Sequence, residues 1–219
     1  MSVRNSELFD LSHTRAAALL EGKTYPWEVL GDISDFIVKL GESLGDDFEE
    51  IKPLVWVHKT AVIAPTASIT GPCIIDEGTE VRHCAFIRGS ALVGRDCVVG
   101  NSTELKNVIL FDHVQVPHYN YVGDSILGYF SHMGAGSITS NVKSDKTNIA
   151  VKDGETLYET GRKKMGAILG DHVEVGCGSV LNPGSIIGRN TNIYPLSSVR
   201  GVISPDSIYK CAGEVAKKE

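Results

Sequence analysis

The sequence predicts an all-β fold: a parallel β-helix of hexapeptide repeats, with a short helical segment before it and a loop extruded from it. Three observations predict this fold. Aliphatic residues return at every sixth position, only 15 of the residues are aromatic, and 23 of the 219 residues are glycine, where about 7% is usual. Period six fits neither an α-helix nor a lone amphipathic strand. Many tight corners around a thin aliphatic core account for all three observations.

The aliphatic ladder defines the repeat. It runs through Val57, Ile63, Ile69, Ile75, Val81, Ile87, Val93, Val99 and Leu105, continues with a one-residue slip as Leu110, Val116, Val122, Leu127 and Met133, and returns after a break as Leu169, Val175, Leu181, Ile187, Ile193 and Val199. Small side chains stand two positions before most of these residues. Three hexapeptide segments make one coil of the predicted prism. Side chains at positions i and i+18 are therefore expected to stack about 4.8 Å apart, as neighbouring strands do.

Two segments lie outside the ladder. Ile33, Ile37 and Leu40 recur at helical spacing near the N-terminus, which predicts helices there. The expected organisation is a helical segment over 1–52, the β-helix over 53–203 with an inserted loop at 139–165, and a C-terminal tail over 204–219. Loops of this length are uncommon in compact domains and are usually functional or mobile.

Composition excludes several classes of protein. Lysine and arginine number 21 against 27 aspartate and glutamate, a formal charge of −6, whereas a general nucleic-acid binder tracks phosphates with a basic surface. The five cysteines form no C-x-x-C pair, and no apolar run is long enough to span a membrane. We therefore expect a cytoplasmic protein without a disulfide framework, a zinc knuckle, a nucleic-acid partner or a membrane partner.

Chemistry on a β-helix must use outward side chains, and three stand out. Arg88 and Lys106 each follow a ladder residue and are one coil apart, so they are expected to stack on one outer edge. Two stacked cations repel unless an anion lies between them, which suits a phosphate; solvated edge residues are the alternative. His118 follows Pro117, and an imidazole at an exposed corner is a candidate base near neutral pH. An isolated histidine is nevertheless more often structural.

Three motifs make the comparison specific. Glu-x-Lys begins at Glu104, His-x-x-Tyr-x-Gly-Asp begins at His118, and Gly-Ala-Gly-x-x-Thr-x-Asn begins at Gly134. This stretch resembles the acetyltransferase half of the bifunctional sugar-1-phosphate nucleotidylyltransferase and amino-sugar-1-phosphate N-acetyltransferase family, and residues 160–171 are similar to its archaeal branch. The resemblance implies a left-handed β-helix, a homotrimer, and acetyl-CoA bound between prisms for nucleotide-sugar precursor synthesis.

The resemblance also implies roles for single residues. His118 matches a general base that deprotonates the amine of glucosamine 1-phosphate or galactosamine 1-phosphate before direct acetyl transfer, without a required metal. Glu104 is expected to orient the imidazole or the sugar, and Asn141 to position the amino sugar. The expected sugar-phosphate residues are Arg88, Lys106, Tyr121, His132 and Lys146, and the expected acetyl-CoA residues are Gly134, Ala135, Gly136 and Cys177. His132 stands where the family more often has asparagine. The basic run of residues 162–164 is expected to be solvated, with CoA phosphates as its alternative partner.

Other interpretations stay open. Residues 1–56 contain no Gly-rich nucleotide-binding loop, so the nucleotidylyltransferase half is expected to be missing and a separate nucleotidylyltransferase is a candidate partner. A γ-class carbonic anhydrase would bind zinc through His113, His118 and His83. A non-catalytic scaffold or regulatory trimer would keep the prism without the chemistry. Metal analysis tests the carbonic anhydrase alternative, and substitution of His118 tests the scaffold alternative.

Overall fold

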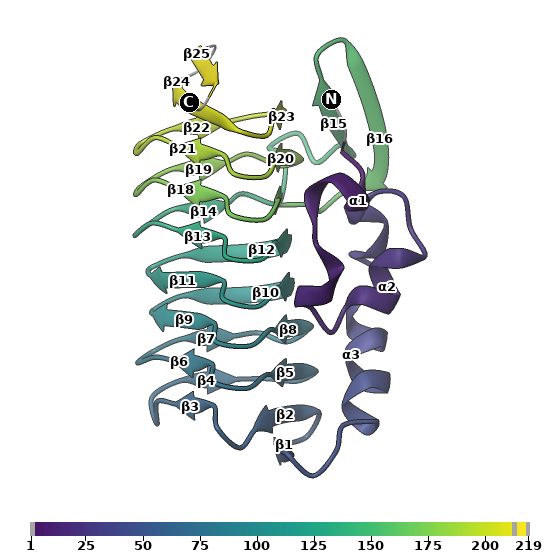
Figure 1. Ribbon diagram of the computed structural model, residues 1–219, viewed down its shortest axis with the longest axis vertical. Helices are drawn as coiled ribbons and strands as arrows, with labels where there is room; N and C mark the ends of the chain where they lie inside the picture. Colours follow the sequence, from purple (N-terminus) through teal and green to yellow (C-terminus); the bar gives the residue numbers. More distant parts are fainter. Residues whose placement is uncertain (1–2, 212–213, 218–219) are drawn as a thin grey trace.

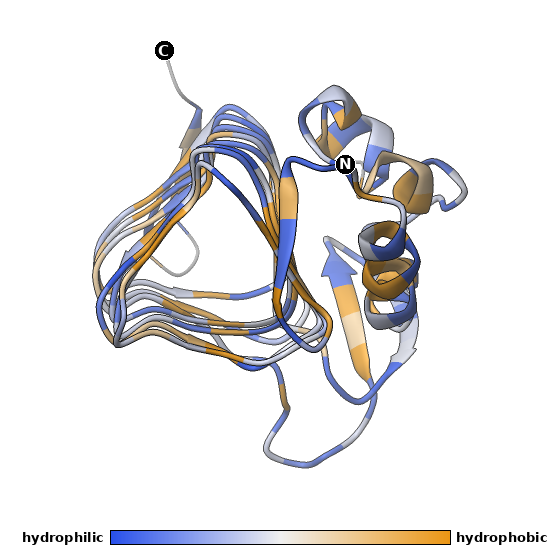
Figure 2. Ribbon diagram, turned by 90° about the horizontal axis from the view of Figure 1, so that it is seen from below, coloured by the Kyte–Doolittle hydropathy of each residue, from blue (hydrophilic) through white to orange (hydrophobic). Residues whose placement is uncertain are grey.

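The structure, a computed structural model, describes residues 3–211 and 214–217. Its body is the predicted left-handed parallel β-helix, in which short strands stack coil upon coil (Figure 1). Seen along its length, the β-helix is a triangular prism with the helices packed against one side (Figure 2). The predicted fold class is confirmed.

The prism has three faces, numbered here in chain order. The first face contains β3 (Val62–Ile63), β6 (Glu80–Val81), β9 (Val98–Asn101), β11 (Gln115–His118), β13 (His132–Met133), β18 (Glu174–Val175), β21 (Asn192–Ile193) and β24 (Ser207–Cys211). The second contains β4 (Ser68–Ile69), β7 (Phe86–Ile87), the first halves of β10 (Glu104–Leu110) and β12 (Tyr121–Leu127), β14 (Ile138–Thr139), β19 (Val180–Leu181) and β22 (Ser198–Val199). The third contains β2 (Val55–His58), β5 (Cys73–Ile75), β8 (Ala91–Val93), the second halves of β10 and β12, β17 (Ala167–Leu169), β20 (Ser185–Ile187) and β23 (Val202–Ile203).

Coil length is not uniform. Ile75 pairs with Val93, as the expected coil length requires, but Val93 pairs with Leu110, one position earlier than that length would place its partner. The next coil is also shorter by one, since Leu110 pairs with Leu127. The slip in the ladder therefore reflects a corner that is one residue shorter. At this corner β10 and β12 run from the second face to the third without a break.

Some small residues of the repeat also form hydrogen bonds at the corners of the prism. Thr79 and Thr103 are fully buried. The Thr79 hydroxyl donates to the Gly94 carbonyl at 2.7 Å, and the Thr103 hydroxyl donates to the Val116 carbonyl at 2.9 Å. Because buried carbonyls need partners, these threonines stabilise the corners as well as filling them.

The N-terminal segment covers the third face (Figure 2). It contains α1 (Asn5–Leu8), the 3-10 turn η1 (Leu11–His13), α2 (Ala17–Glu21), the 3-10 turn η2 (Pro26–Val29) and α3 (Ile33–Glu42). In α3, Ile33 and Ile37 are fully buried, and the helix contacts β5, β8 and β10. Strand β1 (Phe48–Lys52) then pairs antiparallel with β2 and leads into the prism. No helix in the described residues is long and apolar enough to cross a membrane.

Asp171 anchors the start of this segment to the prism. Its buried carboxylate accepts the Asp10 N–H at 2.7 Å and the Tyr129 N–H at 2.9 Å, and it lies 2.9 Å from the Arg189 guanidinium. Burial raises the pKa of the Asp171 carboxyl, and the two N–H donors oppose that rise. The carboxylate therefore joins the segment to two coils at once.

Asp171→Ala is expected to lower the free energy of unfolding by about 2 to 3 kcal/mol, because it leaves two partly buried N–H donors and the Arg189 guanidinium without their acceptor. Urea denaturation measures the loss. Asp206→Asn is the control, because asparagine tolerates the left-handed φ of 53° at this position and the change affects only an exposed hydrogen bond from Asn190; its stability should stay within about 0.5 kcal/mol of the wild type. Equal losses in the two variants would contradict the anchoring role.

The segment predicted as an inserted loop, 139–165, holds regular structure. Strands β15 (Ile149–Asp153) and β16 (Thr156–Arg162) form an antiparallel hairpin beside the N-terminal segment (Figure 1). It packs closely on the prism, since a Cβ at Gly184 would lie 2.8 Å from Ile149 Cγ2 and one at Gly201 would lie 2.8 Å from the Lys152 carbonyl oxygen. Both glycines have positive φ, which L side chains rarely adopt.

The C-terminal boundary also differs from the prediction. Residues 204–219 were expected to form a tail, but β24 pairs parallel with β21 and continues the β-helix to Cys211. Strand β25 (Glu214–Lys217) folds back antiparallel onto β24. The ladder is hard to follow here because Asn192 pairs with Ile208, earlier in the chain than a coil of regular length would place its partner.

Candidate active site

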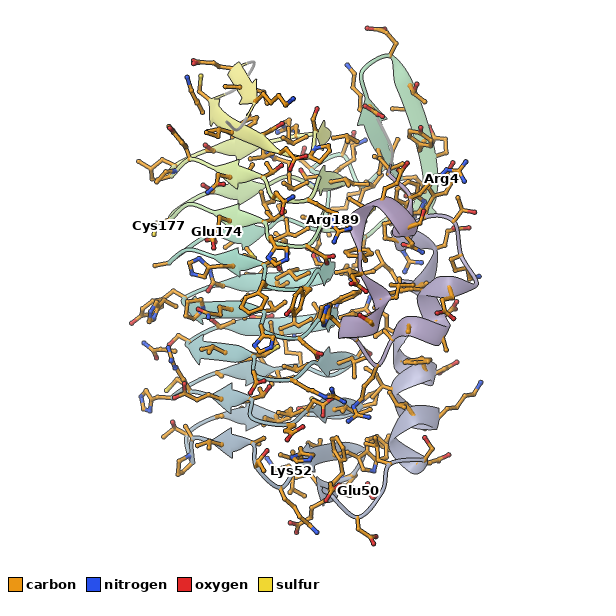
Figure 3. The ribbon with its side chains drawn as sticks, viewed as in Figure 1. Arg4, Glu50, Lys52, Glu174, Cys177 and Arg189 are labelled. Atoms are coloured by element: carbon orange, nitrogen blue, oxygen red, sulfur yellow. The ribbon has the colours of Figure 1, made fainter. Side chains whose placement is uncertain are left out.

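His118 lies at the corner between the first and second faces, below the glycine turn and Cys177. The Gly136 N–H donates to the His118 carbonyl at 3.0 Å, and the Gly178 N–H donates to the Ala135 carbonyl at 2.9 Å. These bonds stack the three coils directly. Figure 3 shows Cys177 at the edge of the prism that faces away from the N-terminal segment. The structure thus gathers the predicted base and all predicted acetyl-CoA residues at one corner.

A buried asparagine fixes this corner. Asn120 is 3% exposed, and its side-chain oxygen accepts the His118 N–H at 3.1 Å. Its amide nitrogen donates to the Gly134 carbonyl at 2.9 Å and to the Ser137 carbonyl at 3.1 Å. The backbone of His118 is therefore held, while its imidazole is exposed and forms no hydrogen bond with the described residues.

Polar side chains cross the second face from this corner to the opposite edge. Glu104 pairs in register with Tyr121, and both side chains point outward beside the ladder residues. Arg88 and Lys106 follow the paired residues Ile87 and Leu105 and occupy consecutive coils, as their spacing predicts. His118 and the two cations therefore lie at opposite edges of one face.

The two cations already have carboxylate partners. Arg88 Nη1 lies 2.6 Å from Glu104 Oε1, and Lys106 Nζ lies 3.8 Å from Asp124 Oδ2. Carboxylates of the protein therefore offset the repulsion between the two cations, so an external anion is not required for them to stack. Glu104 orients Arg88 and forms no hydrogen bond to the His118 imidazole. The Glu104 contact raises the pKa of the exposed Arg88 guanidinium.

Asn141 reaches the same edge through Asp124. The Asn141 amide donates to Asp124 Oδ2 at 2.6 Å, and Asp124 is only 4% exposed. Burial, followed by the charges of Asp124 and Glu104, raises the pKa of the Tyr121 hydroxyl, while a hydrogen bond from Asn141 opposes the rise. Tyr121 is therefore protonated at neutral pH and can donate its O–H to an anion.

Two predicted substrate residues lie elsewhere in the protomer. His132 is on the first face, with its Nδ1 2.8 Å from Glu174 Oε2. Lys146 is exposed in the chain between β14 and β15. Arg162, considered for CoA phosphates, lies over Gly31 of the N-terminal segment, with Nη1 3.1 Å from the position of a Cβ there. None of the described contacts joins these three residues to the other candidates.

The histidines of the zinc alternative are separated in one chain. His113 lies at the corner between the third and first faces, stacked on Phe130 with ring centroids 4.5 Å apart. His83 hydrogen-bonds the Thr66 hydroxyl at 2.7 Å. Across residues 3–211 and 214–217, no group of three or more His, Cys, Asp or Glu side chains is arranged to hold a metal.

One cavity of the protomer lies away from the candidate site. A cavity of about 660 Å³ lies between the hairpin and the prism, and its lining includes Lys143, Lys152 and Arg200. None of the residues on the second face that carry the candidate chemistry lines it. The candidate site is therefore not this cavity.

Three site residues were missed from the sequence. Asn120, Asn107 and Asp124 received no role, although the structure places all three in hydrogen bonds at the site. Asn120 carried a usable signal, because it occupies a position two before the ladder residue Val122, where most coils have a small side chain. Asp124 stood in the quoted Gly-Asp motif without an assigned partner.

Comparison with known proteins places the chain in a family. Residues 69–183 match the family described as GMPPB C-terminal domain. A bifunctional protein GlmU of Methanococcus maripaludis is 35% identical over 206 residues, covering 85% of this chain and 46% of the relative. A bifunctional sugar-1-phosphate nucleotidylyltransferase/acetyltransferase of Sulfurisphaera tokodaii is 28% identical over 190 residues, covering 84% of this chain and 47% of the relative. The chain thus spans about half the length of these relatives.

The chain is also similar to solved structures at low sequence identity. A hexapeptide transferase family protein from Anaplasma phagocytophilum is 15% identical, with coverage of 75% of this chain and 80% of that chain and a TM-score of 0.42. A mutant perosamine N-acetyltransferase from Caulobacter crescentus, in complex with CoA and GDP-perosamine, is 16% identical, with coverage of 75% and 56% and a TM-score of 0.39.

The repeat and the polar second face define a hexapeptide-repeat β-helix domain. The chain belongs to the GMPPB C-terminal domain family, and the predicted resemblance to the acetyltransferase half of the bifunctional enzymes is confirmed.

Proposed function

We propose that this chain is an N-acetyltransferase that moves an acetyl group from acetyl-CoA to the amine of a hexosamine 1-phosphate. One observation carries the proposal. An exposed imidazole at one edge of the second face and two cations at the other edge are separated by Glu104 and Tyr121. This layout suits a ligand with an amine at one end and a phosphate at the other.

In the proposed reaction, His118 accepts a proton from the substrate ammonium. The free amine then attacks the thioester carbonyl, a C–N bond forms, and the carbonyl oxygen becomes an oxyanion. When the intermediate collapses the C–S bond breaks, and the CoA thiolate leaves and takes up a proton from the His118 imidazolium. The nitrogen, which carries a positive charge after the attack, releases its remaining extra proton to solvent, and the neutral amide results. The exposed, uncommitted imidazole suits both transfers.

A backbone N–H group can bind the oxyanion only if it has no acceptor within the protein. The Gly134 N–H donates to the Val175 carbonyl and the Gly136 N–H to the His118 carbonyl, so neither is free. Among the described residues, no acceptor contacts the N–H of Ala135 or of Cys177. These two N–H groups are therefore the proposed oxyanion donors at this corner.

The experiment that tests the function is a thiol-release assay with acetyl-CoA. Glucosamine 1-phosphate, galactosamine 1-phosphate and the two unphosphorylated sugars are compared as acceptors. We expect turnover that depends on the phosphate, because the cations lie across the face from the base. Equal turnover without phosphate would contradict the roles of Arg88 and Lys106, and no turnover with any acceptor would contradict the proposal.

Arg88→Gln is expected to raise the KM for the sugar phosphate about tenfold, the effect of losing about 1.4 kcal/mol of binding, with a smaller change in kcat. Arg82→Gln is the matched control, because Arg82 forms a similar ion pair with Glu80 at 2.8 Å on the first face. Steady-state kinetics measures both. A rise in KM for Arg82→Gln of the same size would show a general charge effect.

We also propose a homotrimer, as the resemblance implies. The site lies on an outer face of the protomer, and a second copy could supply His132, which lies on the first face, and Lys146, which is exposed between β14 and β15. Tyr119 and Leu196, at the corner of His118, are 62% and 84% exposed, which suits burial between copies. Light scattering coupled to size-exclusion chromatography tests the oligomeric state.

A further inference from the structure

The N-terminal segment is hydrogen-bonded to the edge of the candidate site through one side chain. The amide nitrogen of Asn107 donates to the Leu30 carbonyl at 2.9 Å and to Asp124 Oδ1 at 2.9 Å. Leu30 is 1% exposed and lies between η2 and α3. One NH₂ group therefore joins the N-terminal segment to the site, with one proton for each acceptor.

The backbone makes this contact possible. Asn107 and Asp124 have φ of 54° and 49°, the left-handed region that asparagine and aspartate tolerate better than most residues. They occupy the same corner in consecutive coils, because the residues that follow them, Val108 and Ser125, are paired in register. Strands β10 and β12 turn at Asn107 and Asp124, so both side chains meet at the edge between the second and third faces.

Asp124 is shared between the segment and the candidate site. Its Oδ1 accepts from Asn107, while its Oδ2 accepts from the Asn141 amide at 2.6 Å and lies 3.8 Å from Lys106 Nζ. Asp124 is 4% exposed, so the charge-assisted hydrogen bonds that its carboxylate accepts from Asn107 and Asn141 are strong and directional, and Lys106 adds an ion pair. The position of Asp124 therefore decides where Asn141 and Lys106 point.

The end of the inserted hairpin closes the same edge. The Met165 N–H donates to the Asn141 carbonyl at 3.1 Å, and the Gly166 N–H donates to the Asp124 carbonyl at 2.8 Å. Arg162 at the end of β16 covers Gly31, next to Leu30. Segments far apart in the sequence thus converge on Asp124 and Asn107.

We propose that Asn107 and Asp124 are positioning residues for the acetyl transfer, and that the N-terminal segment sets the geometry of the sugar-phosphate edge through the Leu30 carbonyl. This inference rests on the proposed function. Neither residue needs to touch the substrate; Asp124 acts through Asn141 and Lys106, and Asn107 acts through Asp124. The N-terminal segment then has a role in substrate binding besides covering the third face.

The test is Asn107→Asp, which keeps the size of the side chain. The new carboxylate cannot donate to Leu30 and places a like charge beside Asp124. We expect the KM for glucosamine 1-phosphate to rise about 10- to 100-fold, as small misplacements of binding groups do, with the KM for acetyl-CoA unchanged. A uniform loss of folded protein would instead lower the apparent kcat and leave both KM values unchanged.

Two further variants complete the test. N190D is the matched control, because Asn190 donates to Asp206 at 2.9 Å and both residues have positive φ at another corner; its KM values should not change. N107D/D124N removes the like charges and allows the amide at position 124 to donate to the carboxylate at position 107. Part of the rise in the KM for glucosamine 1-phosphate should therefore be reversed.

The outcomes separate the two claims. If the wild-type chain transfers no acetyl group, the proposed function fails, and this inference fails with it. If the wild type is active but N107D leaves the KM for the sugar phosphate unchanged, or N190D raises it equally, or the double variant recovers nothing, only the positioning role is overturned.

Discussion

Replacing His118 with alanine is expected to lower kcat/KM for glucosamine 1-phosphate by about 10²- to 10⁴-fold, the usual effect of removing a general base. The thermal midpoint should hardly change, because the imidazole is exposed and forms no hydrogen bond with the described residues. The KM for acetyl-CoA should also stay near its wild-type value. Steady-state thiol release and a thermal melt measure these three quantities.

A pH profile gives this prediction a second readout. Without the imidazole, only substrate already present as free amine can react, so the residual activity of His118→Ala should rise with pH until the amine is deprotonated. His113→Ala removes a histidine stacked on Phe130 at another corner and is expected to keep wild-type kinetics. Full activity in His118→Ala would contradict the mechanism and favour the scaffold interpretation.

The fold was predictable because its main constraint is local. A residue that faces the interior of a narrow prism must be aliphatic, so the inward positions can be read directly as a period of six. The same reasoning located the corners and hence the stacking of Arg88 over Lys106. The two shortened coils appear in the ladder as steps of five residues, and the pairing of β8, β10 and β12 places the missing residue at the corner between the second and third faces.

The polar network was less predictable because side-chain partners lie off the vertical stack. Arg88 reaches Glu104, which stands before Lys106 on the same strand, whereas the stacking rule directs attention to Lys106 itself. Lys106 similarly pairs with Asp124 in the next coil. Such diagonal contacts depend on rotamers and on the local coil length, and hexapeptide periodicity does not encode either of them.

The regular part of the repeat leads to the second large expected effect, Gly100→Ala. A Cβ at Gly100 would lie 1.5 Å from the Pro117 carbonyl oxygen and 1.9 Å from the Pro117 carbonyl carbon. Both are backbone atoms of the coil above, so the clash cannot be relieved by a side-chain rotation. We expect the free energy of unfolding to fall by about 3 kcal/mol or more, as measured by urea denaturation.

Gly22→Ala is the control, because no atom lies within 4 Å of a Cβ at that position and its φ is −74°; its stability should equal or slightly exceed that of the wild type. Pro117 directly precedes His118, so any folded fraction of Gly100→Ala must displace the backbone that carries the proposed base. That fraction should have a lower kcat per folded molecule than Gly22→Ala. Unchanged stability in Gly100→Ala would mean that the coils at this corner are not stacked as described. It would then also contradict the position described for His118.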